Sequence, residues 1–522
     1  MTTLDWWVIG GYLFAMLGIA AWLGRGQRSE REYYLGGGLP APALATSILA
    51  TQCSTNSLLG APAFVGFAAG GGLLWLQYEL AVPLAMLGLA FLFPAVHRSA
   101  VISIYGFLEQ RLGRSARLTA SGSFLFFRGI ATGVTVYGVA SVLALITGID
   151  YLPAVALLMG VTVTYDVMGG MRAVVVSDVL QMILLVSAVL VSLVWLAPDL
   201  WTHAAALGDR SQPLLNDWGM SGATNFGFWP MLFGGLFLYM AYYGCDQSQA
   251  QRLLAARDER DLQKILVLNG LMRFPLVLAY CLLGLGLAAY ALQEPAFLDE
   301  LPVTASGAPN FNLVFPAFVL REFAPGMAGL AIVGLFAAAM SSIDSALNSL
   351  SASTLEDFLP PELASSERGR FVLSKVTTFS WGLFAVAFSF GVEHIASTLL
   401  EAINKVGSLV NGPLLGLFVI AIVLPGSRSG AAVIAFLSGA VLNLALWQLV
   451  PNLSWLWWNV SGCVTTLVVA VAYRAAGGAV FSVLLSAKGV LVSATPTLAT
   501  RLLLLGGFAG MLVLLAIVQT YN

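Results

Sequence analysis

The chain has 522 residues, of which 59% are hydrophobic and only 10% are charged, and its mean hydropathy is +0.87. Soluble globular proteins carry about 25% charged residues, so the composition excludes that class and predicts a polytopic membrane protein. The net charge of −2 gives no reason to expect a nucleic-acid partner. The four cysteines lack C-x-x-C spacing and the three histidines are scattered, so we expect no disulfide framework, transition-metal site or cofactor. Nothing in the sequence indicates an obligate protein partner.

Apolar runs of about 20 residues, the length that crosses a bilayer as a helix, recur along the whole chain. We predict about fourteen spans, at about 5–24, 41–68, 73–96, 118–146, 151–170, 174–197, 229–250, 264–292, 326–354, 371–392, 399–424, 429–450, 453–474 and 500–520. Most of the 24 Arg and Lys residues then fall in loops on one side. Because basic residues gather on the cytoplasmic side, we expect both termini outside and a multi-pass location in the cell membrane, in particular a bacterial inner membrane.

Two of the predicted spans are interrupted by polar residues. The second reads Thr51-Gln-Cys-Ser-Thr-Asn-Ser57 and the seventh reads Tyr242-Tyr-Gly-Cys-Asp-Gln-Ser248. The seventh span lies five spans after the second, so the breaks hold corresponding positions in two five-helix halves. Such paired breaks indicate an inverted-repeat transporter whose site lies at the broken helices. For each break alone, a kinked helix sealed by its neighbours is an equal alternative.

This pairing predicts how the chain is divided. We expect a first helix and inner loop at 1–40, a first five-helix repeat at 41–197 and an outer loop at 198–228. A second five-helix repeat at 229–424 and three additional C-terminal spans at 425–522 complete the prediction. The loops between the spans are too short to hold a soluble catalytic domain, so the function is expected within the membrane.

The predicted ninth span carries polar residues in a segment otherwise suited to lipid. Within 337–353, one helix face is lined at spacings i, i+3, i+4 and i+7 by Ser341, Asp344, Ser345 and Asn348. An unpaired aspartate near the bilayer centre costs roughly 2.5 to 3.5 kcal/mol, and a bound cation would offset that cost. Close packing of small residues explains the alanines and several serines, but it does not explain Asp344.

Four motifs give residues 5–424 a resemblance to the sodium:solute symporter family. They are Tyr33-Tyr-Leu-Gly-Gly-Gly38, Gly169-Gly-Met-Arg-Ala-Val-Val-Val-Ser-Asp-Val-Leu-Gln181, the run from Ala337 to Ser353, and Asn411-Gly-Pro-Leu-Leu-Gly-Leu-Phe418. Asp166 departs from the family pattern, which usually has a small residue there. The family includes bacterial sugar, sialic acid and proline symporters and mammalian sodium–glucose transporters. The resemblance implies an all-α, LeuT-type 5+5 inverted repeat with flanking helices.

The resemblance also implies a main sodium site. Carried over by motif, the ligands would be the hydroxyls of Ser341 and Ser342 together with the carbonyls of Ala338, Ala50 and Cys53. Neutral oxygens of this kind suit sodium, because a hard cation takes several oxygen ligands and must bind weakly enough to leave again.

Some family members have a second sodium site, which the resemblance would place at Asp178, Ser341, Asp344 and Ser345. Here a carboxylate, Asp344, replaces one of the hydroxyl ligands. It either strengthens the site or acts as a structural cap or a proton carrier. The rival interpretation gives Asp178 a structural role at the inner end of its helix.

Positions that match family solute contacts are Ser54, Ser57, Gln77, Glu79 and Tyr242. Glu79 could accept hydrogen bonds from a solute or pair with a basic side chain. Leu271 stands where sugar-binding members carry a lysine, which counts against a simple sugar. The sialic acid members hold a carboxylate with an arginine at the position of Ala131, and Arg128 stands one helical turn earlier. A buried arginine suits a carboxylate, although Arg128 could instead snorkel to the headgroups or pair with a helix end.

Together these features predict a sodium-coupled secondary active symporter that imports a small polar organic solute, with carboxylates as one class, by alternating access. A sugar, amino acid or vitamin as solute, and protons in place of sodium, are the alternatives within this fold. A transporter-like membrane sensor is the alternative from a different class. We find neither a nucleophile–base pair nor a metal-ligand cluster, so we do not expect an enzyme. The expected partners are the solute, sodium as the coupling ion and the lipid bilayer.

Overall fold

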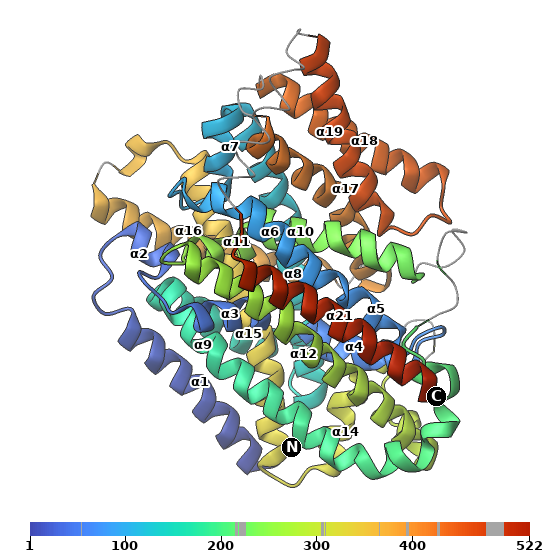
Figure 1. Cartoon of the computed structure of the whole chain (residues 1–522). Coiled ribbons are helices and arrows are strands. Elements are labelled where there is room, and N and C mark those ends of the chain that lie inside the picture. Colours follow the sequence, from blue (N-terminus) through green and yellow to red (C-terminus); the bar gives the residue numbers. More distant parts are fainter. Residues whose placement is uncertain are drawn as a thin grey trace.

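The computed structural model describes residues 1–53, 55–214, 218, 226–303, 307, 309–364, 366–392, 396–424, 429–476 and 495–521. Within these ranges the secondary structure is helical, apart from an isolated bridge between Val303 and Pro309 (Figure 1). The α-helices are α1 (Thr3–Leu23), α2 (Glu30–Leu35), α3 (Ala41–Gln52), α4 (Thr55–Phe67), α5 (Leu76–Glu79), α6 (Ala81–His97), α7 (Ile104–Leu112), α8 (Arg114–Thr147), α9 (Tyr151–His203), α10 (Gly235–Cys245), α11 (Gln247–Leu254), α12 (Glu259–Gln293), α13 (Ala296–Asp299), α14 (Val314–Glu322), α15 (Met327–Ser353), α16 (Glu367–Val392), α17 (Ala396–Val423), α18 (Ser429–Leu449), α19 (Trp457–Ala476) and α21 (Leu498–Tyr521).

The helices have the length and composition of membrane spans. Ten helices in the described ranges are long and apolar enough to cross a bilayer, and two shorter apolar helices cover Ser57–Phe67 and Gly407–Val423. The predicted multi-pass character is therefore confirmed, while the number of spans and their sidedness stay predictions.

α9 covers 53 residues and contains the fifth and sixth predicted spans. A helix of that length extends about 80 Å, whereas the hydrocarbon core of a bilayer is about 30 Å thick. The backbone leaves the helical conformation at Gly170, where φ is 53° and ψ is −158°. A Cβ atom there would lie 2.6 Å from the Tyr33 ring. Only glycine suits this position, and it separates the two predicted spans by a kink.

Both predicted interruptions are present. α3 ends at Gln52 and α4 begins at Thr55, so the second predicted span is split at the expected place. α10 and α11 meet at Asp246, whose backbone is extended and whose carboxylate accepts a hydrogen bond of 2.8 Å from the Ser248 amide. This N-cap satisfies one of the free N–H groups that begin α11. Each break therefore leaves backbone groups that neighbouring side chains or ligands can use.

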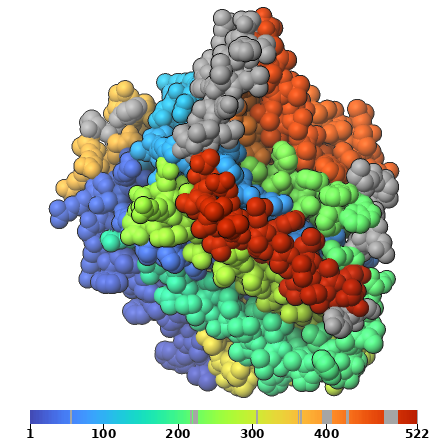
Figure 2. Space-filling model, viewed as in Figure 1, coloured from blue at the N-terminus to red at the C-terminus, as the bar shows by residue number. Residues whose placement is uncertain are grey.

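α15 lies inside the bundle, packed against α9, α1, α8 and α3. Nearly all of its residues are buried, including its serines and Asp344. The outer helices show the opposite pattern, because they expose large apolar side chains such as Val194, Leu383, Val441 and Leu502. Figure 2 shows α21, in red, crossing the visible face of the molecule. A lipid environment favours this arrangement, in which polar side chains within the membrane are buried in the bundle and apolar side chains face the lipid.

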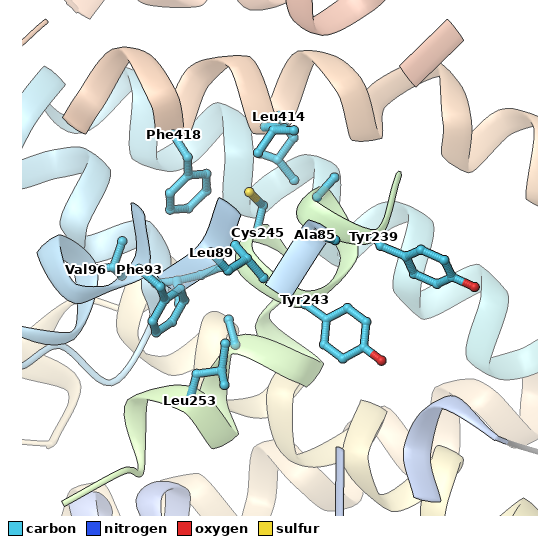
Figure 3. Close-up of a cluster of buried hydrophobic side chains, with 14 of the residues drawn as sticks. Ala85, Leu89, Phe93, Val96, Tyr239, Tyr243, Cys245, Leu253, Leu414 and Phe418 are labelled. Atoms are coloured by element: carbon cyan, nitrogen blue, oxygen red, sulfur yellow. The ribbon is translucent and has the colours of Figure 1, made fainter. Parts of the chain in front are cut away.

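A cluster of apolar side chains joins the two broken helices to the C-terminal part of the chain. Figure 3 shows Leu89 and Phe93 of α6 facing Leu414 and Phe418 of α17, with Cys245 at the end of α10 between them. Because Cys245 at the end of α10 and Leu253 of α11 both belong to this cluster, the packing holds the two helices on either side of the break.

Candidate functional site

The end of α3 supplies free carbonyl groups beside the buried helix α15. Cys53 closes the helix with an amide that donates to the Leu49 carbonyl at 2.8 Å, and its own backbone is no longer helical. The carbonyls of Ala50 and Thr51 belong to the last turn of α3. Carbonyl groups in the last turn lack the N–H donors that a continuing helix would supply. They are therefore available to side chains or to a cation.

Oxygens from α3 and α15 meet at this point. The Ser341 hydroxyl lies 3.1 Å from the carbonyl oxygen of Ala50 and 3.3 Å from that of Ala338. The Ser342 hydroxyl lies 3.3 Å from the carbonyl oxygens of Thr51 and Ala338. Oxygens that bind one hard cation at about 2.4 Å, at right angles to each other, are about 3.4 Å apart. The two hydroxyls thus join α15 to the end of α3, at distances compatible both with hydrogen bonds and with shared coordination of one cation.

Hydrogen bonds connect four of the predicted sodium ligands, Ala50, Ala338, Ser341 and Ser342, and the carbonyl of Cys53 stays a prediction. No hydrogen bond in the described ranges joins Cys53 to these oxygens, and the Thr51 carbonyl, which the sequence prediction omitted, contacts Ser342 instead. The difference follows from where α3 ends, since a helix that continues to Gln52 leaves the Thr51 carbonyl in its final turn.

The predicted second sodium site contains a buried cation of the protein itself. Arg252 of α11 is 0% exposed, and its guanidinium lies 3.3 Å from the carboxylate of Asp178. It also donates to the hydroxyl of Ser345 and, at 2.5 Å, to that of Ser47. The Ser47 hydroxyl donates to Asp178 in turn. Asp178 is therefore neutralised by an ion pair, as a buried carboxylate requires.

Asp344 lacks such a partner. One carboxylate oxygen accepts hydrogen bonds from the Ser345 amide at 2.5 Å and hydroxyl at 3.2 Å. The other oxygen, Oδ2, has no hydrogen-bond partner within the described residues. The contacts run from Asp178 through Arg252 to Ser345 and then to Asp344, so the two carboxylates are connected only indirectly. Arg252, near the C-terminal end of α11, was not among the residues predicted for this site.

A cavity of about 590 Å³ lies among α8, α10 and α17 and reaches Gln52 at the first break. Aromatic and aliphatic side chains such as Trp75, Phe127 and Leu414 form most of its wall. A few polar residues from different helices interrupt that wall. Cavities with this composition and size are typical of sites for small organic ligands.

Arg128 lines the cavity, as predicted for a solute-binding residue, and Tyr242 lies beside it. The Arg128 guanidinium lies 3.4 Å from the Asp246 carboxylate, donates to the Tyr242 hydroxyl at 3.3 Å and donates to the Ser248 hydroxyl. It also lies 5.5 Å from the centre of the Tyr242 ring, within cation–π range. These contacts tie α8 to the break between α10 and α11, so Arg128 pairs with a helix end while still facing the cavity.

Glu79 is paired with an arginine rather than presented to the cavity. Its carboxylate accepts from Arg273 at 2.7 Å and 3.3 Å and from the Tyr239 hydroxyl at 3.0 Å. Figure 3 shows the Tyr239 hydroxyl pointing away from the apolar cluster. Arg273 also donates to the side-chain oxygen of Gln52, and both of these residues line the cavity. Gln52 and Arg273 were not among the predicted solute-binding residues.

The other predicted solute contacts do not form the cavity wall. Ser57 donates to the Gln52 carbonyl at 3.3 Å, and Gln77 donates to the Leu74 carbonyl at 3.2 Å. Both side chains are thus engaged with nearby backbone in broken or short helices. Ser54 lies outside the described residues.

The comparisons with known proteins agree with this geometry. The model of the sodium:solute symporter family matches residues 33–439. The chain is 30% identical to a sodium-coupled monocarboxylate transporter 1 of Xenopus laevis, over 82% of this chain and 69% of that protein. It is 28% identical to the human sodium/iodide cotransporter, over 85% and 69% of the two chains. It is 26% identical to the sodium/sialic acid symporter SiaT of Proteus mirabilis (strain HI4320), over 85% and 89%.

Two solved structures share the fold. A Na⁺-coupled sialic acid symporter in a substrate-bound, outward-open state has a TM-score of 0.77 and 24% identity, covering 90% of this chain and 97% of that one. The nucleobase-cation symporter Mhp1 has a TM-score of 0.53 and 12% identity, covering 92% and 98%. The all-helical, multi-span architecture is therefore of the LeuT type. The chain belongs to the sodium:solute symporter family, and it is a sodium-coupled solute symporter of the membrane, not an enzyme.

Proposed function

We propose that this symporter imports a small organic carboxylate together with sodium. The observation that carries the proposal is the position of Arg128, which faces the cavity beside the break between α10 and α11. Its Nε atom is buried and has no hydrogen-bond partner in the described part of the chain, so a solute would bind by exchanging with the contacts that Nη2 makes to Asp246 and Ser248. A guanidinium with a free N–H group is suited to a carboxylate, because its donors match the two oxygens in one plane.

The size of the cavity supports an organic solute. A volume of about 590 Å³ lies within the usual range for organic ligands, whereas a monatomic anion would leave most of the aromatic wall without contact. Two of the relatives are named for organic acids, the monocarboxylate transporter and the sialic acid symporter. Sugars, amino acids and vitamins remain the alternative solutes, and a multivitamin transporter is also among the relatives.

Sodium would bind where the hydroxyls of Ser341 and Ser342 meet the carbonyls of Ala50, Thr51 and Ala338. Each sodium charge that falls through 100 mV yields about 2.3 kcal/mol. At about 1.4 kcal/mol per decade, that supports about 50-fold accumulation of solute per charge. Binding of sodium and solute would favour each other by linkage, so no covalent chemistry is needed.

For the predicted second sodium site, the contacts support the structural alternative for Asp178. Its ion pair with Arg252 already supplies a positive charge, and Ser47 donates to the same carboxylate oxygen, Oδ2, while Oδ1 has no partner within the described residues. We therefore assign Asp178 to holding α9 against α11. Asp344 has an unpartnered oxygen and no ion pair within the described residues, so we keep it as the candidate for binding an additional cation or a proton.

The sidedness predicted from basic residues gives the cavity a direction. Met231 and Trp455 would lie toward the outside, and Arg128 and Asp246 would lie deeper. We propose that the described conformation faces outward in a cell membrane. Import would then require the outer end to close and the contacts of Arg128 with α10 and α11 to open.

A thermal-shift screen of the purified protein tests the solute class. We expect a carboxylate to raise the midpoint of unfolding only when sodium is present, because ligands that bind the folded state stabilise it by mass action. Arg128→Gln should remove that shift, whereas Arg257→Gln on the exposed loop should retain it. If neutral sugars raise the midpoint and no carboxylate does, the assignment of Arg128 is wrong.

A further inference from the structure

Asp166 is the residue that departs from the family pattern, and it has no role in the features described so far. It lies in α9 one turn before the kink at Gly170, and it is 0% exposed. Within the described ranges Asp166 forms no ion pair, whereas Asp178 in the same helix is paired with Arg252. A buried carboxyl group in a membrane protein needs a cationic partner or a proton, because an isolated charge is costly to bury.

Neutral groups surround the Asp166 carboxyl. Its Oδ1 atom accepts a hydrogen bond of 3.4 Å from the side-chain amide of Asn348, and its Oδ2 atom has no hydrogen-bond partner within the described residues. The Tyr33 hydroxyl lies 3.3 Å from the backbone carbonyl oxygen of Asp166, so it satisfies the backbone and not the side chain. Several donors or a cation are needed to hold a carboxylate in its ionised form. One long amide contact supplies neither, so the site suits the neutral acid.

The charged and titratable groups around Asp166 do not supply the missing cation. They are Asp178 of α9, Arg252 of α11, Asp344 of α15, Tyr33 and Tyr34 of α2, and Lys375 of α16. Arg252 and Asp178 act on Asp166 only through their charges, which have opposite signs and form one ion pair. Lys375 lies over the Tyr33 ring, 6.0 Å from its centre, and forms no ion pair with Asp166 within the described residues. In the same ranges, α1, α3, α8 and α12 bring no charged group into contact with Asp166.

Asn348 connects this carboxyl to α11, the second half of a broken helix. The Gln251 side-chain amide donates to Asn348 Oδ1 at 2.8 Å and to the Tyr34 carbonyl oxygen at 2.7 Å. α9, α15, α11 and α2 therefore meet at one polar cluster. α2 belongs to the loop that we predict to lie inside, so the cluster closes the inner end of the bundle. Movement of α11 away from α15 would break these contacts and let water reach Asp166.

We propose that Asp166 is a proton-binding site, which holds a proton in the described conformation and releases it to water when α11 moves away from α15. A proton adds no volume, so the burial of both carboxyl oxygens does not prevent its binding. The ionised form is favoured only where water reaches the carboxylate, so protonation and inner opening oppose each other by linkage. Acid on the inner side therefore favours the described conformation. The proposal does not depend on which solute the cavity takes.

The pH dependence of unfolding tests whether the folded protein holds this proton. A carboxyl group that is protonated when folded and ionised when unfolded lowers stability as the pH rises above the usual range of an aspartic acid. Asp166→Asn resembles the neutral acid and has no proton to release. The unfolding midpoint of the wild type should therefore fall more steeply between about pH 5 and 8 than that of the variant. The difference should approach about tenfold in the unfolding equilibrium constant per pH unit, the limit for one proton.

Asp166→Ser is a second variant without a titratable group, and it introduces a small residue as in the family pattern. Its unfolding should show the same weaker pH dependence as that of Asp166→Asn. Asp150→Asn is the matched control, because Asp150 is exposed at the N-cap of the same helix and its side chain makes no capping hydrogen bond. This control should keep the wild-type pH dependence.

Hydrogen exchange of the α11 amides tests the link to opening, because exchange reports the population of locally opened states. After correction for the intrinsic pH dependence of exchange, α11 of the wild type should be as protected as in Asp166→Asn at about pH 5 and severalfold less protected at about pH 8. Equal protection in the two proteins at both pH values would overturn the link. Neither measurement needs a solute, so both stay decisive if the proposed carboxylate function fails.

The proton site itself is overturned if either substitution at Asp166 gives a folded protein with the wild-type pH dependence of unfolding. If neither variant folds, the infrared spectrum of the wild type at neutral pH decides. We expect the carbonyl band of a protonated carboxylic acid there, and the absence of such a band would overturn the proposal.

Discussion

Ser342 is the residue at which the proposed sodium site can be tested by removing a single oxygen. Its hydroxyl contacts two backbone carbonyls, from α3 and from its own helix, so Ser342→Ala removes one ligand without changing the backbone. Hydrogen bonds and ligand contacts to a charged group contribute about 1.5 kcal/mol or more, so the sodium concentration for half-maximal uptake should rise about tenfold. The measurement is the sodium dependence of solute uptake.

Ser438→Ala provides the comparison, since it makes the same chemical change on the exposed face of α18. Its half-maximal sodium concentration should match that of the wild type. If Ser342→Ala also behaves as wild type, the oxygens between α3 and α15 are not the coupling site.

The charged residues show what a sequence does and does not reveal at this scale. Arg128 and Tyr242 were predicted at the solute site and do face one another at the cavity. The partner of Glu79 was not predictable, because Arg273 lies 194 residues further along the chain. Likewise Arg252 and Asp178 are 74 residues apart. A buried charge in a membrane demands a partner, but only the fold identifies which one.

At the scale of elements, the kink in α9 rests on one glycine. Gly170 has a φ of 53°, and a Cβ atom there would lie 2.6 Å from the Tyr33 ring and 2.7 Å from its carbonyl oxygen. Gly170→Ala should therefore lower the free energy of unfolding by at least about 1 to 2 kcal/mol, from the left-handed backbone alone. A lower midpoint of thermal unfolding and weaker sodium-driven uptake are the expected results.

Gly160→Ala is the matched change in the same helix. Gly160 has no atom within 4 Å of an added Cβ and is exposed, so alanine should be neutral or stabilise the helix by about 0.5 to 1 kcal/mol. Equal unfolding midpoints for the two variants would show that the kink does not depend on glycine.

Helix interruptions were the most predictable elements, because polar residues inside apolar runs mark them directly. Both breaks lie where the sequence predicted them, at Gln52 to Thr55 and at Asp246. The boundary between the fifth and sixth predicted spans, placed after residue 170, coincides with the kink at Gly170, although the chain passes from one span to the next without a loop.

At the scale of the whole molecule, the buried polar residues are set within an apolar core, and the outer helices also expose large apolar side chains. α15 is almost wholly buried, while α16, α18 and α21 present apolar side chains to the surroundings. The composition predicted this arrangement, and the family resemblance predicted the LeuT-type fold that the solved relatives share. Which solute the cavity takes depends on side chains from helices far apart in sequence, so composition and motifs could only narrow it.

Uptake into proteoliposomes tests the central claim most directly. Purified protein would be reconstituted and supplied with labelled carboxylates at fixed pH, with and without an inward sodium gradient. The account predicts accumulation that requires the sodium gradient, collapses when the gradient is dissipated and falls strongly in Arg128→Gln. Equal uptake of the carboxylate from sodium-free buffer at the same pH would contradict it.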